Sequence, residues 1–561
     1  MHIERIGPAE RSPLATEVMV PMRDGVRLAT DVYLPGGDTT PGPVILTRLP
    51  YDKNGGYTAL PEVAEYFLRF GYRIVVQDVR GKFRSEGERL LFVNEADDGY
   101  DTIDWITKQP WSNGIVGMWG DSYYGFTQWA AVSTAHPALR AIAPRVTGTR
   151  LGELAAPIPG THTREVEMGV HRMYPLTMFH DQDMLMWQMD WTTLPYHDTV
   201  EKFFAQVGSR SASYDVWYPN PVRLRRFRHG SPFDAPAVPV LMTIGWWDNC
   251  APWQWQDHRE IQRRPHWAIN EYLLIEAIDH ESNSHFDRPW LGGGARPTPE
   301  ERRATLPRYL GPAVEFFDVF LRGAGKPADI PRVRWQLANA DPSFRVSETW
   351  PPPETTTITL YPSDATAARG KAPGGDLGPD RPAAGVEATW KHDPTGPVPS
   401  LAPDPFAYLL FHPDQRGNLD RPDVLVFGGP PLAEPLDLVG PVSLRAQVRA
   451  DGPELDLFAK LFDLAPDGSA HLIARGQVTV LAAGYDRDVE VDLGHAGYRL
   501  PAGHALGLAI AGSDAPEFVP FWGQEGNRWA QTTASVTTQS ITLGGPSGAA
   551  LSLTVHRGTG S

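Results

Sequence analysis

The stretch that decides the fold is residues 117–125, which read Gly-Met-Trp-Gly-Asp-Ser-Tyr-Tyr-Gly. It overlaps the end of a short apolar run, residues 115–118, that is typical of a buried strand, and it leads directly into a stretch that is typical of a helix. A tight turn from strand to helix lifts a serine hydroxyl to the edge of a sheet, where it can act as a nucleophile. Ser122 is therefore the candidate nucleophile.

The spacing around Ser122 departs from the strict Gly-x-Ser-x-Gly pattern. Tyr124 stands where the second glycine is expected, and Gly125 comes one residue later. A serine at this place can also cap the helix that follows it. By pattern alone, nucleophile and helix cap both remain open for Ser122.

Short apolar runs and helix-like stretches alternate on both sides of this turn. Continuous apolar strands separated by amphipathic helices predict a mostly parallel sheet with helices on both faces, that is, an α/β domain. Before it, residues 18–34 alternate around an Asp-Gly turn, which predicts a hairpin. The expected strands are residues 44–46, 74–76, 115–118, 240–244 and 272–275, and the expected helices are residues 61–70, 95–108 and 124–133.

The sequence pattern changes twice along the chain and so indicates three regions. The α/β pattern stops at about residue 150 and resumes at about 233, and six of the 11 methionines lie between residues 168 and 189. Residues 1–150 and 233–345 are therefore expected to form one α/β domain, with a helical cap inserted at 151–232. Residues 346–561 carry short alternating strands and predict an all-β sandwich or jelly roll, and the Gly/Pro-rich residues 363–405 predict a boundary with long loops.

Composition and charge exclude several classes of protein. With 561 residues the chain is too long for one core. The net charge of −16 without a basic run argues against nucleic acid as a partner. A single cysteine, Cys250, excludes an internal disulfide and a thiolate metal cage, and we expect neither a metal nor a cofactor. Because no signal peptide and no apolar membrane span is visible, we expect a cytoplasmic protein without a membrane partner. The sequence leaves open whether it is a homodimer.

A base and an orienting acid follow two later strands. Asp248 comes just after the strand expected at 240–244, and His280 comes just after the strand at 272–275. Open α/β sheets place their sites at the carboxyl ends of the strands, and the order Ser, Asp, His is the one that this type of fold imposes. His285 is the rival base, but His280 lies closer to its strand. The string at 280–285 lacks the second histidine of an H-E-x-x-H zinc motif.

Nearly from end to end, the sequence resembles the cocaine esterase/X-prolyl dipeptidyl peptidase family of serine hydrolases. The motifs that carry the resemblance are Gly-x-Ser-Tyr-x-Gly at 120–125, Arg-Leu-Pro-Tyr-Asp-Lys at 48–53, Asp-Val-Arg-Gly at 78–81 followed by Ser-Glu-Gly at 85–87, Gly-Trp-Trp-Asp at 245–248, His-Pro-Ala-Leu at 136–139, Tyr-Asp-x-Trp at 214–217, and Leu-Val-Gly-Pro-Val at 438–442 with residues 456–463.

The resemblance implies an α/β-hydrolase core, an inserted helical cap and a C-terminal jelly roll. It makes Ser122 the nucleophile, Asp248 the orienting acid and His280 the base. It also implies an oxyanion hole formed by the phenol of Tyr51 and the backbone N–H of Tyr123. A donor from an early loop and the N–H after the nucleophile can flank a developing oxyanion.

One string departs from the family. Members usually carry Gly-Pro-Trp-x-His before the base, whereas residues 276–280 read Glu-Ala-Ile-Asp-His. The loop that carries His280 must therefore differ locally. Asp78 and Arg80, at another strand end, are interpreted as a structural ion pair.

The substrate class follows from the aromatic residues near the acid. Tryptophans beside Asp248 and the Met-rich cap favour an apolar or aromatic acyl group, and hence a small-molecule ester as the substrate. Within the family, an X-Pro dipeptidyl peptidase or a β-lactam or amide acylase stays open, as does an acyltransferase that uses the same triad. A binding protein on a hydrolase scaffold is disfavoured because the whole triad is present.

The expected pocket residues are Trp246, Trp247, Trp253, Met184 and Trp187. Four acidic residues of the cap are interpreted as a solvated face rather than an ammonium site: Glu165, Glu167, Asp181 and Asp183.

Overall fold

The computed structural model describes residues 2–37, 40–219, 222, 224–281, 297–369, 371–401 and 414–556. It divides into two compact units. The first consists of Met1–Gly152, Arg172–Gln188 and Val207–Arg334, and the second of Glu153–His171, Met189–Gln206 and Trp335–Ser561. The segment expected to form a cap contributes to both units, and its separation as a domain at 151–232 stays a prediction.

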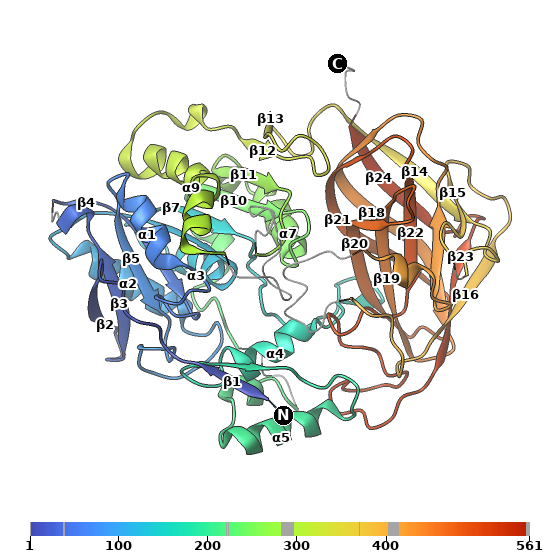
Figure 1. Ribbon diagram of the computed structural model, residues 1–561, viewed down its shortest axis with the longest axis horizontal. Helices are drawn as coiled ribbons and strands as arrows, with labels where there is room; N and C mark the ends of the chain where they lie inside the picture. The colour runs from blue at the N-terminus through green and yellow to red at the C-terminus, as the bar shows by residue number, and fades with distance from the viewer. Residues whose placement is uncertain are drawn as a thin grey trace. The chain divides into compact units, whose positions relative to one another are not determined.

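The first unit is built on a mixed sheet (Figure 1). Its strands run in the order β11-β10-β7-β6-β4-β5-β3-β2, and all neighbours from β5 to β11 are parallel. The antiparallel hairpin β2–β3 closes one edge of this series, because β3 pairs antiparallel with β5. The parallel sheet and the hairpin are thus confirmed. The strands are β2 (Thr16–Pro21), β3 (Arg27–Tyr33), β4 (Gly42–Leu49), β5 (Arg73–Asp78), β6 (Ser112–Asp121), β7 (Leu139–Arg145), β10 (Val240–Gly245) and β11 (Glu271–Glu276).

Helices cover this sheet in two groups, α1 packed with α9 and α2 packed with α3. The longest, α9, begins with a capping box between Thr298 and Glu301 and ends at Gly323, whose φ of 67° suits a glycine. Its buried face includes Phe316, Phe317 and Leu321, so burial on the sheet stabilises it. The helices are α1 (Leu60–Leu68), α2 (Glu95–Thr107), α3 (Ser122–Val132), α7 (Ala251–Gln262), α8 (Pro265–Ala268) and α9 (Pro299–Arg322).

In its described part, the segment between β7 and β10 carries the helices α4, α5 and α6 and two short strands, joined by long loops. One of these strands, β9, pairs antiparallel with β1 near the chain start. Arg5 of β1 also pairs with Asp181 at 2.6 Å. The elements are β1 (Ile3–Ile6), β8 (Thr163–Arg164), α4 (Gly169–Thr177), β9 (Met184–Trp187), α5 (Tyr196–Val207) and α6 (Ala212–Asp215).

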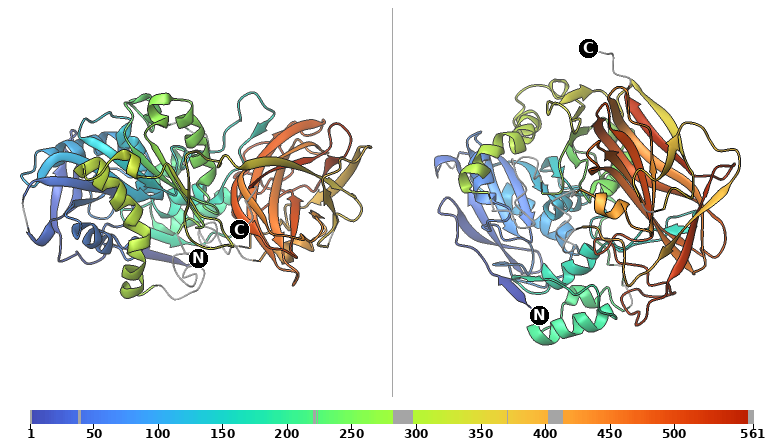
Figure 2. Two further views of the ribbon diagram at one scale, coloured as in Figure 1. Left: turned by 90° about the horizontal axis from the view of Figure 1, so that it is seen from above. Right: turned by 45° about the vertical axis from the view of Figure 1, so that its right-hand side comes forward.

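The C-terminal part of the second unit is all-β, as predicted, and its strands, yellow to red, can be followed in Figure 2. One expectation is wrong: residues 363–405 do not form only loops, since β15 and β16 lie within them. β16 pairs over its whole length with β23, so long-range pairing overrides the Gly/Pro-rich composition. Between α9 and this all-β part the chain forms β12 (Val333–Trp335) and β13 (Arg345–Ser347), which belong to the sheet of β11. The elements of the all-β part are β14 (Thr355–Ser363), β15 (Gly375–Gly378), β16 (Val386–His392), α10 (Arg416–Leu419), β17 (Val424–Gly428), β18 (Leu436–Ala450), β19 (Glu454–Leu464), β20 (Ala470–Leu481), β21 (Arg487–Leu500), β22 (Ala505–Ala511), β23 (Thr537–Leu543) and β24 (Ala550–His556).

No helix within the described ranges combines the length and the apolar character that a membrane crossing requires.

Candidate active site

Ser122 lies at the junction of β6 and α3. Its φ is 49°, in the left-handed region that residues other than glycine rarely adopt. Its carbonyl oxygen accepts a hydrogen bond of 2.6 Å from the hydroxyl of Thr147. A strained serine at a strand-to-helix turn is the geometry expected of a nucleophile elbow.

Two glycines make room for this turn. A Cβ at position 120 would clash with the ring of Tyr124, and a Cβ at position 125 would lie 2.7 Å from Cγ2 of Thr147. Gly125 is thus the position where α3 comes closest to the residues after β7. This explains why the second glycine of the motif stands at 125, while Tyr124 is accommodated by the absence of a side chain at Gly120.

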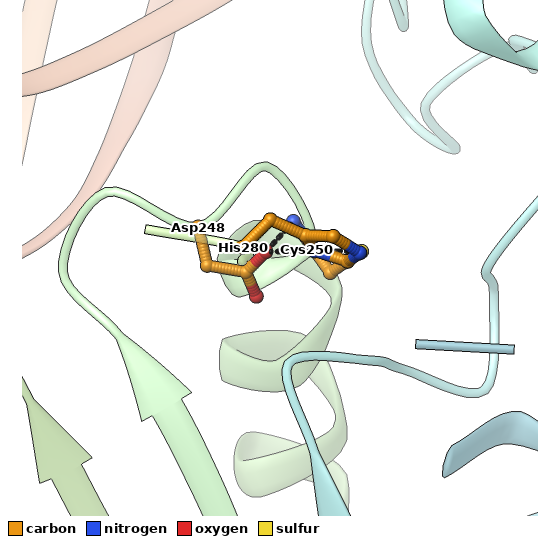
Figure 3. Close-up of side chains that lie close together, drawn as sticks. All are labelled: Asp248, Cys250 and His280. Atoms are coloured by element: carbon orange, nitrogen blue, oxygen red, sulfur yellow. Dashed lines mark hydrogen bonds and ion pairs between the residues drawn. The ribbon is translucent and has the colours of Figure 1, made fainter. Parts of the chain in front are cut away.

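Asp248 and His280 meet beyond the ends of β10 and β11. Nδ1 of His280 donates to Oδ1 of Asp248 over 2.7 Å, and the backbone N–H of Cys250 donates to the same oxygen over 3.0 Å. The backbone N–H of Trp247 donates to the carbonyl of Ile278, which ties the two loops together. Figure 3 shows the side chains of Asp248, Cys250 and His280 side by side. The rival base His285 lies outside the described residues.

The surroundings change the proton affinity of this group. Burial alone lowers the pKa of His280, but Cys250 and Asp248 outweigh it, and the pKa of His280 is raised well above its ordinary value. Burial raises the pKa of the Cys250 thiol to about 12, so this thiol is neutral near pH 7. The carboxylate of Asp248 is therefore the group that stabilises a protonated His280.

Asp248, Cys250 and His280 also present ligand atoms within 4.8 Å of one another, close enough to hold a metal ion. Whether these three side chains suit a metal ion depends on which of their ligand atoms are already protonated or hydrogen-bonded. A thiol whose pKa is about 12 must lose its proton before it can bind a metal, and Nδ1 of His280 already donates to Asp248. The residues fit acid–base chemistry better than a metal site.

Tyr51 follows β4. Its hydroxyl makes a very short hydrogen bond with the hydroxyl of Tyr174, which belongs to α4 and lies 123 positions away in the sequence. Burial raises the pKa of the Tyr51 phenol, and the side chain of Ser122 lies near enough to act on this pKa in the opposite direction. The structure thus brings Tyr51 to Ser122, as the oxyanion assignment requires. Sequence reasoning missed Tyr174, and no motif singles it out.

The loop after Tyr51 is held by buried charges. Asp52 adopts a φ of 67°, and its carboxylate accepts a 2.6 Å hydrogen bond from the N–H of Ala9. The next residue, Lys53, donates its backbone N–H to Asp78 over 2.8 Å. Burial raises the pKa of Asp78 to about 7.

Asp78 and Arg80 do not pair with each other, so their interpretation as an ion pair is wrong. Arg80 instead pairs with Asp98 at 2.6 Å and with Asp24 at 2.7 Å. Because β5 ends at Asp78, Arg80 lies beyond the strand, where residues two positions apart no longer have to share one face.

The phenol of Tyr123 points into the scaffold. It donates to Glu95 over 2.8 Å and accepts from the N–H of Phe92 over 3.1 Å. Its ring stacks on Phe92, with centroids 4.7 Å apart. This side chain anchors the start of α3, which leaves the backbone N–H as the only part of Tyr123 that suits an oxyanion hole.

The expected pocket residues lie in the loop after β10, in α7 and in β9. Trp246 and Trp253 are buried near Asp248, and Trp246 stacks on Trp255 with centroids 6.3 Å apart. Trp247 is half-buried. Met184 and Trp187 are buried in β9, where they pair with β1. Their contact with a substrate stays a prediction.

Glu281 and Tyr57 are two further polar residues that sequence reasoning missed. The hydroxyl of Tyr57 donates to Glu281 over 2.5 Å, and Glu281 directly follows His280. The ring of Tyr57 meets that of Tyr51 edge-on at 5.7 Å. This hydrogen bond links the loop that carries Tyr51 to the loop that carries His280.

Comparison with known proteins agrees with this arrangement. Residues 24–281 match the X-Pro dipeptidyl-peptidase (S15 family) model, and residues 325–548 match the X-Pro dipeptidyl-peptidase C-terminal non-catalytic domain. Cocaine esterase of Rhodococcus sp. (strain MB1 Bresler) is 30% identical over 548 residues, which cover 90% of this chain and 92% of that protein. The chain belongs to the cocaine esterase/X-Pro dipeptidyl-peptidase family.

Solved structures support the same fold. An α-amino acid ester hydrolase matches with a TM-score of 0.78 and 24% identity, and an aminopeptidase from a marine sediment archaeon (Thaumarchaeota archaeon) with 0.78 and 20%. Each match covers 98% of both chains. An α/β-hydrolase core with a C-terminal all-β domain is therefore the architecture of this family member. It is a serine hydrolase of the esterase/peptidase type.

Proposed function

We propose that this chain hydrolyses carboxylic esters with an apolar or aromatic acyl group through a Ser122–His280–Asp248 triad. The observation that carries the proposal is the 2.7 Å hydrogen bond between His280 and Asp248, at the sheet edge where the elbow serine also lies. The carboxyl ends of parallel strands share one edge, so β6, β10 and β11 deliver their residues to the same side. The likeness to cocaine esterase supports an ester as the substrate.

The mechanism is acyl transfer in two halves. His280 accepts the proton of Ser122 as Oγ attacks the ester carbonyl, and the oxyanion receives hydrogen bonds from the Tyr51 phenol and the Tyr123 N–H. The tetrahedral intermediate collapses as His280 gives its proton to the leaving alcohol, which leaves an acyl-enzyme. Water, deprotonated by His280, then attacks this ester, and release of the acid returns the proton to Ser122. Asp248 holds the imidazole in the tautomer that both halves need.

We assign the class of acyl group from the chemistry of the side chains expected to surround it. A tryptophan face and a flexible methionine wall suit aromatic or branched apolar groups. We place the acyl pocket at Trp246, Trp247, Trp253, Met184 and Trp187.

The acidic residues of the cap favour an ester over a substrate with a free ammonium group. Asp181 and Asp183 both pair with Arg5, at 2.6 and 3.2 Å, so each carboxylate already has a cationic partner. An ammonium group buried in the site needs a carboxylate that is free to pair with it. This observation supports an ester hydrolase over an X-Pro dipeptidyl peptidase, while an amide acylase or an acyltransferase would use the same triad.

The first experiment compares wild type with Ser122→Ala on p-nitrophenyl esters from acetyl to benzoyl, Gly-Pro-p-nitroanilide and a glutaryl anilide. We expect the highest kcat/KM on the aromatic ester and a loss of about 10⁶ in kcat in the variant, as in serine proteases. Ser133→Ala is the matched control, because Ser133 is a buried serine that ends the same helix and bonds only to a helix carbonyl among the described contacts.

The outcomes separate the candidates. Preference for Gly-Pro-p-nitroanilide would replace the ester hydrolase by a dipeptidyl peptidase, and preference for the glutaryl anilide would indicate an acylase. Transfer of the acyl group to an added amine or alcohol faster than to water would indicate an acyltransferase. Ester turnover that survives in Ser122→Ala would refute the triad.

A further inference from the structure

Tyr51 must have a free proton if its phenol is to stabilise an oxyanion, and Tyr174 decides whether it has one. The two hydroxyls share a very short hydrogen bond, in which either oxygen could donate. A phenol has one proton. If Tyr51 donates to Tyr174, it has nothing left to give the oxyanion; if Tyr174 donates to Tyr51, the proton of Tyr51 stays available.

We propose that Tyr174 is a positioning residue that donates its hydroxyl proton to Tyr51 and so directs the proton of Tyr51 toward the acyl oxygen at Ser122. This inference rests on the proposed function, since it assumes that Tyr51 forms part of the oxyanion hole. In this role Tyr174 acts on the oxyanion through Tyr51.

Both oxygens keep their protons over the working pH range. Burial raises the pKa of Tyr174 to about 12 and the pKa of Tyr51 well above its ordinary value. Each phenol therefore keeps its one proton. When Tyr174 donates its proton to Tyr51, the proton of Tyr51 is available to a third partner. A third partner lies nearby, because the side chain of Ser122 is close enough to the Tyr51 phenol to act on its pKa, against the larger effect of burial.

The ring of Tyr51 is held from other sides. It meets the ring of Tyr57 edge-on at 5.7 Å and that of Tyr124 edge-on at 6.3 Å. These contacts fix where the phenol lies, but they do not fix the direction of its O–H bond. A donor at the Tyr51 oxygen is what sets that direction.

Tyr174 is itself well placed by α4. The hydroxyl of Ser211 donates to the carbonyl of Pro175 over 2.6 Å, and the N–H of Met178 donates to the carbonyl of Tyr174 over 2.9 Å. A helix anchored in this way presents the Tyr174 hydroxyl without ordering it anew in each catalytic cycle. In a chain of hydrogen bonds each donor strengthens the next, so Tyr174 makes Tyr51 a better donor.

The test is a double-mutant cycle with Tyr51→Phe, Tyr174→Phe and both changes together, measured on the best p-nitrophenyl ester. Tyr51→Phe should lower kcat by about 10²–10³, as expected for one oxyanion donor. Tyr174→Phe should lower kcat roughly tenfold with little change in KM, comparable to the loss of an outer hydrogen-bond partner elsewhere. The double variant should match Tyr51→Phe alone, because Tyr174 has no other route to the oxyanion.

A second measurement separates positioning from general damage. An arylboronic acid forms a tetrahedral adduct with an active-site serine, so its inhibition constant should rise in Tyr174→Phe by the same factor as kcat falls, while the inhibition constant of benzoate stays unchanged. An inhibition constant does not depend on how much of the sample is folded. Tyr72→Phe is the matched control for the loss of a phenol hydroxyl, since Tyr72 donates to Asp318 over 2.7 Å.

The results that overturn the inference differ from those that overturn the function. If Tyr51→Phe is impaired but Tyr174→Phe matches wild type or exceeds it, the bond runs from Tyr51 to Tyr174 and the inference is wrong. If the two losses multiply in the double variant, Tyr174 acts independently of Tyr51, and the inference is wrong again. If Tyr51→Phe keeps full activity while Ser122→Ala is inactive, the oxyanion assignment fails. Activity in Ser122→Ala would remove the proposed triad itself.

Discussion

Arg145 and Glu276 form a buried ion pair, with 3.2 Å between Nη1 and the carboxylate, that links the ends of β7 and β11. The same guanidinium lies 3.2 Å from Asp121, the residue before Ser122. Glu276 begins the string in which this chain departs from its family. Glu276, where the sequence departs from the family, is therefore paired with Arg145 in the structure. Because Arg145 also pairs with Asp121, one cation joins the strand ends that precede Ser122 and His280.

Removing this cation should destabilise the first unit. Arg145→Met removes the cation that pairs with the buried Glu276 and the partly buried Asp121, and loss of one partner of a buried pair costs about 3–5 kcal/mol. Glu276→Gln leaves Arg145 its pairing with Asp121 and should cost less. Melting temperatures measure these losses, and that of Arg145→Met should be lower than that of Glu276→Gln.

The control for Arg145→Met is Arg445→Met, which breaks an exposed pair with Glu490 in the all-β part and should cost about 0–1 kcal/mol. Equal melting temperatures for Arg145→Met and Arg445→Met would contradict a structural role for the buried cation.

Activity should be lost on acidification at a pH above the ordinary histidine range. His280 must be neutral to accept the proton of Ser122, and its pKa is raised, so protonation begins to remove the base as the pH falls through this raised value. The acid limb of kcat/KM should therefore have its midpoint above about 6.5, the ordinary value. Initial rates from pH 4 to 10 measure it. A profile that stays flat down to pH 4 would argue against a histidine base.

Asp248→Asn should lower kcat by about 10⁴, as the same change does in a serine protease, because the imidazole then takes the wrong tautomer. The acid limb should also shift to lower pH, because the carboxylate that stabilises the protonated imidazole is gone. Asp279→Asn is the control on the same loop, where the carboxylate accepts a 3.1 Å hydrogen bond from the N–H of Glu281. A larger loss in Asp279→Asn than in Asp248→Asn would reverse the assignment of the acid.

Gly125→Ala should push α3 away from the residues after β7. The added Cβ would lie 2.7 Å from Cγ2 of Thr147 and 3.2 Å from the carbonyl oxygen of Arg145. Overpacking of this kind costs about 1–3 kcal/mol, and it should also lower kcat because Ser122 begins the helix. Melting temperature and ester turnover are the measurements.

Thr147→Ser, added to Gly125→Ala, removes Cγ2 and keeps the hydroxyl that donates to Ser122. It should restore part of the lost stability. No recovery in the double variant would show that Cγ2 of Thr147 is not the cause, since the Cβ at 2.8 Å remains in serine.

Much of the scaffold could be predicted from local patterns. The strands of the core were found because continuous apolar runs bounded by turns are characteristic of buried parallel strands. Ser122, Asp248 and His280 could be chosen because each follows such a strand, and the carboxyl ends of parallel strands meet at one edge. Tyr51 was different, since only the family resemblance singled it out.

Other parts of the molecule could not be predicted in this way. β16 lies in a Gly/Pro-rich stretch, and its pairing with β23 joins residues about 150 positions apart. Asp78 and Arg80 were expected to pair because they are close in sequence, whereas the structure gives each of them other partners. Local composition does not report which distant group a side chain will meet.

The sequence by itself determined the order of strands and helices, the serine turn at 117–125 and the strand ends beyond which Asp248 and His280 stand, because these depend on periodicity and on the position of turns. Only the tertiary structure decided that Tyr174 reaches Tyr51, that Glu281 reaches Tyr57 and that Arg145 joins Asp121 to Glu276. Those contacts form between segments far apart in the chain, and their geometry is set by packing, which no local pattern encodes.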